Sequence, residues 1–423
     1  MFSGKAVCLT FLFLTLAASG PGATLTVTVD GAGTVSPNLN GQDLQLGKIY
    51  TVNARPAAGY LFAGWTGSLP GKAASLSFVM QEGLALQANF VPNPFIARKG
   101  IYTGLYSVPD APLGTVAGGI TITTTDRGTF TGSLIFLGKK VAFTGQFNLS
   151  GTAAGFVLLA PTSPAVLTLD LLGGPGVTGS ISNGTTVAVI RADRAGFSPS
   201  QPAPYAGKYT MIVPGTAGAG DGYAAVTVDP IGRVKAAGKL ADGTAFTQSA
   251  AMASDGSWPF FVSLYKGGGM AWGWLSFTNR EQTDVDGLLT WVRPGPAPST
   301  ASNMVVTASG VQGSRYTASP GRVLNFSDGL LTLSGGGLAQ PFPAAITLTA
   351  NNQVLDNTAL NGTGIRLRTV LKTTTGIFTG SLTPPAFSHV TRFEGAVFQK
   401  GNFGSGFFLN GGTNGQVTIE GLE

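Results

Sequence analysis

The sequence contains almost none of the residues on which disulfides and most catalytic sites depend. Its 423 residues include one cysteine, Cys8, and one histidine, His389. A disulfide framework is therefore excluded, so the folded cores have to be held together by apolar burial alone. A catalytic triad or a His-rich metal site would have to be built on His389, which we expect at a loop or strand edge. We predict no catalytic residues and no enzyme activity.

Charge is also scarce. Asp, Glu, Lys and Arg make up 10% of the chain, against roughly 25% in an average domain. The net charge is +6, but the basic residues are scattered and no run is longer than two, as at Lys139 and Lys140. A nucleic-acid binder concentrates such residues in a stripe or patch. We therefore predict no nucleic-acid partner.

Long hydrophobic runs are absent beyond the first residues. A short basic start at 1–5 precedes an apolar run at 6–18, and small residues follow up to Ala23. The run is shorter than the ~20 residues of a spanning helix, and the layout is that of a secretory signal peptide. We predict a signal peptide over 1–23, with an N-terminal membrane anchor as the alternative. The protein is then exported to the extracellular space or the cell envelope, and no transmembrane helix remains.

Helical periodicity is missing as well, and alternation takes its place. Leu25, Val27 and Val29 share one face of an extended segment, as do Ile346 and Leu348. Such alternation predicts strands, and Asp-Gly and Asn-Gly pairs predict the tight turns between them. We predict an all-β fold with a small N-terminal β module followed by Gly-rich antiparallel meander modules, in barrels or sandwiches. The turn pairs begin at Asp30, Asn183, Asp242, Asp255, Asp286 and Asp328.

Proline-rich stretches are expected to divide the chain into modules. Proline lacks the backbone N–H that pairs between strands, and it stiffens the chain, so such stretches suit linkers. Recurring strings, such as GIYTGLY and GKYTMIV or TTTDRGTFTGSL and TTTGIFTGSL, favour repeated modules over shared composition. The breaks lie at 92–94, 198–204 and 293–299. They predict an N-terminal module at 24–93 and three β-meander modules at 94–198, 199–295 and 296–423, of which the middle one is rich in tryptophan.

Residues 24–92 carry a more specific pattern. The order G-Y-x-F-x-x-W-x-G, then F-x-M and A-x-F, resembles the divergent InlB B-repeat family of bacterial exported and surface proteins. The resemblance covers about a sixth of the chain. The matching positions are Gly31, Gly33, Val35, Gly47, Tyr50, Val52, Ala54, Pro56, Gly59, Tyr60, Phe62, Trp65, Gly67, Phe78, Met80, Ala88 and Phe90.

The resemblance implies a small β module that spaces or displays other domains. It implies a stalk or adhesive role and supplies no catalytic residue. The large aromatic residues of this segment bury ~150–250 Å² each, which a module of this size without disulfides needs. The repeat occurs once here, which weakens a long-stalk interpretation.

Tryptophan is concentrated in the middle β-meander module, residues 199–295. Met270, Trp272 and Trp274 alternate along GGGMAWGWLSF and therefore share one strand face. Trp258 and Trp291 lie nearby. If the face is covered, these residues form core. If it is exposed, Trp272, Trp274, Met270 and Trp258 form an aromatic ligand-binding platform for sugars.

Three acidic residues lie close together in NREQTDVDG. Glu281, Asp284 and Asp286 predict either a solvated loop or a Ca²⁺ site, which requires six to eight oxygen ligands. An acid/base pair is the remaining interpretation. Ca²⁺ at this loop is the only cofactor that the sequence suggests.

These observations predict a non-enzymatic exported or cell-surface protein that acts in adhesion, in envelope or matrix structure, or in glycan binding. Its partner would be a surface polysaccharide or an envelope protein. One alternative is a polysaccharide-active enzyme on a β scaffold, which needs two convergent carboxylates. The other is an outer-membrane β-barrel, which alternating strands permit.

Overall fold

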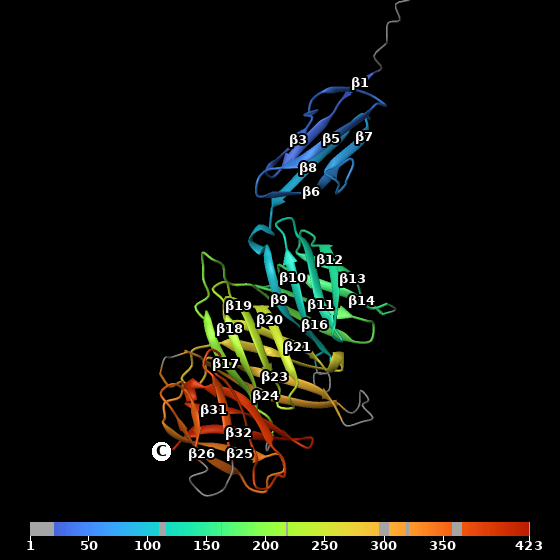
Figure 1. The fold of residues 1–423 in the computed structure, drawn as a ribbon. Coiled ribbons are helices and arrows are strands. Elements are labelled where there is room, and N and C mark those ends of the chain that lie inside the picture. Colours follow the sequence, from blue (N-terminus) through green and yellow to red (C-terminus); the bar gives the residue numbers. More distant parts are fainter. Residues whose placement is uncertain are drawn as a thin grey trace, which may run out of the picture. The chain divides into compact units, whose positions relative to one another are not determined.

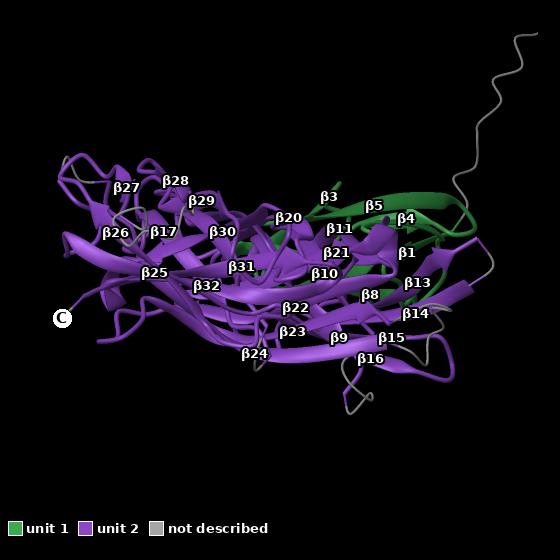
Figure 2. Ribbon diagram, turned by 60° about the horizontal axis from the view of Figure 1, so that its bottom comes forward, with its two compact units in different colours: residues 1–96 green, residues 97–423 purple. Residues whose placement is uncertain are grey.

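The computed structural model describes residues 21–109, 116–161, 163–216, 219–295, 304–318, 321–357 and 366–422. Strands joined by turns dominate it, which confirms the all-β prediction. The chain divides into two compact units, residues 1–96 and 97–423 (Figure 2). The predicted signal peptide lies outside the described residues except for its last three. Among the residues described, no helix has the length and apolar character needed to span a membrane. Short 3₁₀ turns occur at η1 (Ile96–Arg98), η3 (Tyr265–Gly267) and η6 (Gln399–Gly401).

The first unit consists of three small sheets, β1-β4, β2-β8-β6 and β3-β5-β7. Strand β2 runs parallel to β8, whereas the other pairs are antiparallel. Its strands are β1 (Gly22–Thr24), β2 (Thr26–Asp30), β3 (Gly33–Ser36), β4 (Asp43–Gln45), β5 (Ile49–Pro56), β6 (Tyr60–Gly67), β7 (Ser75–Val79) and β8 (Ala85–Pro92).

Aromatic residues form the core of this unit. Trp65 is buried and its indole Nε1 donates a hydrogen bond to the Ala73 carbonyl at 3.0 Å. Phe90 packs so closely on β3 that a Cβ at Gly33 would lie 2.5 Å from its ring. Phe78 and Met80 are buried in the same cluster. The positions that carry the family resemblance therefore include the residues that hold the unit together.

The second unit contains three eight-stranded antiparallel sheets (Figure 1). In each, the first strand pairs with the last, so the meander curls into a nearly closed barrel. The first barrel comprises β9 (Gly100–Ser107), β10 (Ala117–Thr124), β11 (Thr129–Phe136), β12 (Lys139–Gln146), β13 (Thr152–Ala160), β14 (Ser163–Asp170), β15 (Val177–Ser182) and β16 (Val187–Arg194). The second barrel comprises β17 (Gly207–Val213), β18 (Gly222–Val228), β19 (Arg233–Lys239), β20 (Ala245–Ala251), β21 (Ser257–Leu264), β22 (Gly269–Phe277), β23 (Val285–Pro294) and β24 (Met304–Arg315). The third barrel comprises β25 (Asp328–Gly335), β26 (Phe342–Leu348), β27 (Val354–Asp356), β28 (Arg368–Lys372), β29 (Ile377–Leu382), β30 (Thr391–Phe398), β31 (Phe403–Asn410) and β32 (Thr413–Gly421).

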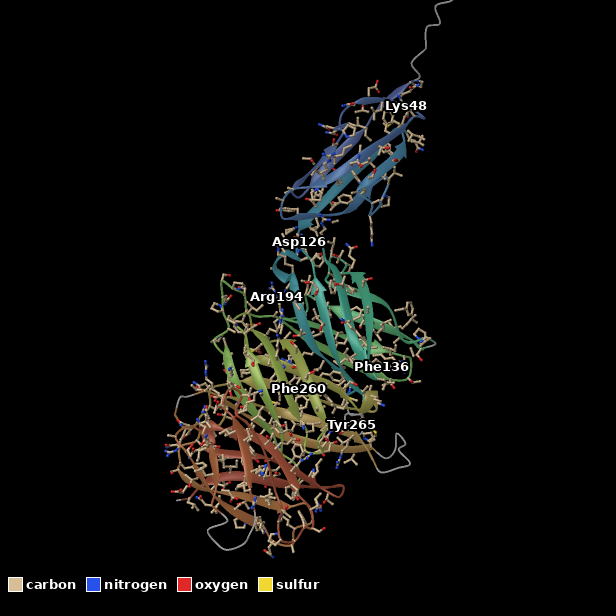
Figure 3. All side chains as sticks on the ribbon, in the orientation of Figure 1. Lys48, Asp126, Phe136, Arg194, Phe260 and Tyr265 are labelled. Carbon is tan, nitrogen blue, oxygen red and sulfur yellow. The ribbon has the colours of Figure 1, made fainter. Side chains whose placement is uncertain are left out.

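Apolar side chains fill the barrels. Alternate residues of each strand point inward, and in the second barrel Trp258, Phe260 and Leu275 have no exposed surface. Figure 3 marks Phe260 on this sheet. A hollow among apolar residues of the third barrel, including Leu324, Ile346 and Phe378, has a volume of about 10 Å³.

The first and second barrels are closed by the same local device. Tyr102 on β9 donates its hydroxyl proton to the Arg98 carbonyl at 2.7 Å, four residues earlier, and Tyr209 on β17 does so to Tyr205 at 2.8 Å. An arginine at the end of the last strand donates hydrogen bonds to the backbone just before the first strand. Arg194 donates to the Ala97 and Lys99 carbonyls, and Arg315 donates to the Ala206 carbonyl. The GIYTGLY and GKYTMIV strings are therefore equivalent in space, as repetition predicts.

The other recurring string is not equivalent in position. TTTDRGTFTGSL forms the β10–β11 hairpin, between the second and third strands of its barrel, whereas TTTGIFTGSL forms the β28–β29 hairpin, between the fourth and fifth. Two predicted turns are also wrong, because Gly287 and Gly329 lie within strands β23 and β25. A Cβ at Gly287 would lie 2.4 Å from the Trp274 carbonyl oxygen, so this glycine permits close strand approach.

The proline-rich stretches differ in their structural roles. The stretches at 92–94 and 198–204 separate one set of sheets from the next. The stretch at 293–299 instead begins within β23, which pairs with the next strand, β24, in the second barrel. The structure therefore ends the second barrel at Arg315, not at residue 295 where the sequence placed the boundary.

The second barrel lies between the other two (Figure 1). Its junction with the first barrel consists largely of backbone contacts. Thr103 on β9 donates its hydroxyl proton to the Ala251 carbonyl at 2.8 Å, and the Gly196 N–H donates to Met252 at 3.0 Å. Gly267 in η3 approaches Leu137, and a Cβ there would lie 2.4 Å from the Leu137 carbonyl oxygen.

The junction with the third barrel uses charged side chains. Glu394 on β30 accepts hydrogen bonds from Lys239 at 2.8 Å and from the Tyr223 hydroxyl at 2.8 Å. Lys400 forms an ion pair with Asp284 at 2.6 Å. Additional contacts are Thr210 to the Val397 carbonyl, Ser405 and Gln416 to Asp221, Asn414 to the Ala241 carbonyl, and the stacked rings of Tyr223 and Phe407.

Candidate functional site

The predicted aromatic platform is a contact surface within the second unit. Met270, Trp272 and Trp274 point outward from β22 and are half-buried, as the alternation predicts. The Arg191 guanidinium of the first barrel lies over the Trp274 ring, 4.2 Å from its centroid. Arg191 is held in turn by Asp193 at 2.8 Å. The Trp274 ring is therefore covered by a cation–π contact between barrels, while a ligand-binding role for Met270 and Trp272 stays a prediction.

Trp258 lies on the opposite side of the same sheet. It is completely buried, and its Nε1 donates a hydrogen bond to the Gln248 side chain at 3.0 Å. This contact spans the gap between β20 and β21, where the barrel has no strand pairing. Its assignment to a ligand-binding site is thereby corrected, because a core residue cannot reach a ligand on the outer surface.

The acidic loop does not assemble into a metal site. Asp284 is buried and accepts hydrogen bonds from Lys400 and, at 2.7 Å, from the Arg315 N–H. Asp286 forms an ion pair with Arg280 at 3.0 Å, and Glu281 is exposed. Within the described ranges, no three His, Cys, Asp or Glu residues are grouped to hold a metal ion. Positive side chains are thus paired with two of the three acids, Asp284 and Asp286.

His389 lies in the loop between β29 and β30, as the sequence predicts. It is exposed, and its ring stacks on Phe387 with centroids 5.8 Å apart and planes 6° from parallel. No carboxylate is paired with it by any ion pair among the described residues. The arrangement favours a surface packing role for His389.

A site that the sequence analysis did not identify lies on the outer face of β18, β19 and β20. We call it the small-residue groove. It encloses about 470 Å³. Opposed residues form two rows across the three strands, Thr227–Lys235–Ser249 and Ala225–Ala237–Thr247. The complete lining is Ala225, Thr227, Lys235, Ala236, Ala237, Thr247, Gln248 and Ser249.

Short side chains keep this floor flat. Among the six residues of the two rows, only Lys235 is long, and it extends from the centre of one row. Each end of the floor is bounded by a neighbouring barrel. At one end Lys239 binds Glu394 of the third barrel, and at the other Ala251 accepts the hydrogen bond from Thr103 of the first. A polymer could therefore lie across the three strands between the two barrels.

A second hollow continues from the first at Gln248 and Ser249, which line both. We call it the inter-barrel groove. It encloses about 240 Å³ between the first and second barrels. Its lining is Thr103, Gly104, Gly119, Ile120, Thr121, Ser133, Ile135, Lys140, Gln248, Ser249, Ala250, Pro259 and Phe261. Hydroxyls and two lysines, one in each groove, provide the polar contacts.

Carboxylates are absent from the linings of both grooves as far as the described residues define them. Glu394, at the third-barrel end of the floor, is occupied by Lys239 and Tyr223. Burial and the Glu394 carboxylate raise the pKa of Tyr223, so its hydroxyl stays protonated as a donor. The grooves thus offer hydrogen-bond donors and positive charge but no paired acids for hydrolysis.

A different hollow lies on the first barrel, about 400 Å³ in volume, and Asp170 is its only charged lining residue. The Asp170 carboxylate accepts the N–H groups of Leu172 and Gly173 at 3.0 and 2.9 Å. This carboxylate therefore serves the turn after β14. A signal for the small-residue groove was present in the sequence: Ala225 and Thr227 alternate along β18, and Ala245, Thr247 and Ser249 alternate along β20.

Comparison with known proteins identifies one segment. Residues 23–94 match the family model of the divergent InlB B-repeat domain. No curated protein sequence matches the chain. Among solved structures, transferrin binding protein B from serogroup B Neisseria meningitidis is 14% identical, with 94% of this chain and 78% of that chain covered at a TM-score of 0.16. Endo-1,5-alpha-L-arabinanase from Thermotoga petrophila RKU-1 is 8% identical, with 71% and 97% covered at 0.19.

TM-scores this low carry no inference about the fold or function of the present chain. The family match, in contrast, coincides with the segment that the sequence pattern indicated and with the first compact unit. It confirms the resemblance predicted from the aromatic and glycine spacing. Residues 23–94 form a divergent InlB B-repeat domain, a bacterial repeat domain, and the remainder of the chain is matched by no family.

Proposed function

We propose that this protein is an exported, non-catalytic bacterial surface or matrix protein that binds a polysaccharide in the small-residue groove. The observation that carries the proposal is the flat floor of opposed alanine, serine and threonine residues between two barrels. A linear sugar polymer presents many hydroxyls along an extended chain. Exposed Thr227, Thr247 and Ser249 provide matching donors and acceptors.

The rest of the chain supports a binding role over a catalytic one. Glycoside hydrolysis requires two carboxylates about 5–9.5 Å apart, and the described lining of both grooves contains none. The barrels hold the floor on rigid strands, which suits a preformed site. The InlB B-repeat domain would display this site at the surface.

The test is binding of the mature protein to a panel of plant and bacterial polysaccharides by isothermal titration calorimetry. Thr247→Phe places a ring on the floor at an exposed position and should abolish binding while leaving the thermal unfolding profile unchanged. Thr131→Phe is the matched control, since Thr131 is an exposed strand residue on β11 outside both grooves. Equal binding by the two variants would refute the site.

A further inference from the structure

The charges of the two grooves indicate the class of polymer. We propose that the groove ligand is an acidic polysaccharide, whose carboxylate or other anionic groups are bound by Lys235 and Lys140. This inference rests on the proposed polysaccharide-binding function and specifies its substrate class. It concerns only the side chains that line the two grooves.

Lys235 is placed to bind an anion. It lies opposite Thr227 on β18 and Ser249 on β20, so its ammonium extends from a floor of short polar side chains. No ion pair among the described residues involves Lys235. Lys239, four residues along the same strand face, is in contrast neutralised by Glu394 at 2.8 Å. The groove therefore retains its positive charge where the ligand would lie.

Lys140 provides a second ammonium group, on the first-barrel side of the inter-barrel groove. It belongs to β12 of the first barrel, is exposed, and lines the inter-barrel groove that continues from Ser249. Because no carboxylate among the described residues lines either groove, both ammonium groups act with the same sign on one ligand. A polymer with regularly repeated anionic groups can engage both lysines, whereas a neutral glucan would leave them without a partner. Charge-assisted hydrogen bonds to a carboxylate are stronger than neutral ones.

The same grooves are poorly suited to nucleic acid. Single-stranded binding sites combine a continuous basic track with aromatic side chains on which successive bases stack. Here two separate lysines line the grooves, and Phe261 is the only aromatic residue in their described linings. Sugar hydroxyls and carboxylates match the serine, threonine and lysine groups better.

The experiment compares polygalacturonate with its fully methyl-esterified form, which has the same backbone without charge. Titration calorimetry of the mature protein should show tighter binding of polygalacturonate, and the difference should shrink at high salt. Lys235→Gln should weaken polygalacturonate binding about fivefold, and it should weaken binding of the ester less than this. Lys372→Gln, at an exposed residue of β28 outside both grooves, is the matched control.

Three outcomes separate the two proposals. Equal binding of acid and ester, with no effect of Lys235→Gln but loss in Thr247→Phe, would overturn the acidic class and retain the polysaccharide site. Binding of neither polymer nor any other polysaccharide would refute the proposed function itself. Tighter binding of single-stranded DNA than of polygalacturonate would overturn the inference in favour of a nucleic acid.

Discussion

The second barrel is joined to the first through backbone and glycine contacts and the Arg191–Trp274 cation–π pair, and to the third mainly through ion pairs and side-chain hydrogen bonds. Close backbone contacts tolerate substitutions of nearby surface charges, but they do not tolerate a side chain added at the contact itself. A partly buried ion pair is destabilised when one partner is removed, because the other charge then stays buried without compensation. The two junctions should therefore be sensitive to opposite kinds of substitution, although both lie along the edges of the grooves.

The largest effect is expected at the third barrel. Asp284→Ala removes the carboxylate that accepts hydrogen bonds from the Lys400 ammonium and the Arg315 N–H, and Lys400 keeps the Arg280 carbonyl as an acceptor. The free energy of unfolding should fall by about 2–4 kcal/mol, with separation of the third-barrel transition in scanning calorimetry. Asp286→Ala is the control, because its Arg280 partner is largely exposed, and it should cost about 0.5 kcal/mol. Equal losses from the two variants would show that the junction does not depend on this pair.

A smaller effect is expected at the junction with the first barrel. Gly267→Ala adds a Cβ that would lie 2.4 Å from the Leu137 carbonyl oxygen, at a residue with φ of +93°. Gly184→Ala has nearly the same strain, φ of +92°, but no neighbouring atom within 4 Å. Denaturant unfolding should show Gly267→Ala to be less stable than Gly184→Ala by about 1–2 kcal/mol. Equal denaturant midpoints for the two variants would mean that the contact between Gly267 and Leu137 does not contribute to stability.

The third effect concerns pH and is confined to alkaline solution. Burial, followed by the hydrogen bond to Asp242, raises the pKa of Tyr265 to about 12, from 10.0. Tyr265 begins η3, the turn that contacts Leu137 (Figure 3). The unfolded chain loses this proton near pH 10 while the folded chain retains it, so the stabilisation is complete below pH 10 and lost as pH approaches 12. Tyr265→Phe should reduce the decline in unfolding midpoint over that range. If the midpoint of Tyr265→Phe declines as steeply as that of the unchanged protein, groups other than Tyr265 cause the loss of stability.

The fold class followed from the sequence because alternation and turn residues are local signals. Leu25, Val27 and the Asn183-Gly184 turn specify strands and reversals without reference to the rest of the chain. The first and last strands of a barrel, in contrast, are joined by contacts between residues far apart in sequence, such as Tyr209 and Arg315. For that reason the proline stretch at 293–299 was assigned to a boundary, although its flanking strands pair.

The candidate site depended still more on tertiary structure. Alternation placed Trp272 and Trp274 on one face, but only the docking of the first barrel decided that Arg191 would lie over the Trp274 ring. The three nearby acids suggested a metal, but Lys400, more than a hundred residues away, neutralises Asp284. The sequence by itself determined an all-β chain without disulfides and an InlB B-repeat domain near its start, because those features rest on local patterns and composition. Strand register and barrel docking decided which side chains share the groove, because both bring together residues from distant strands.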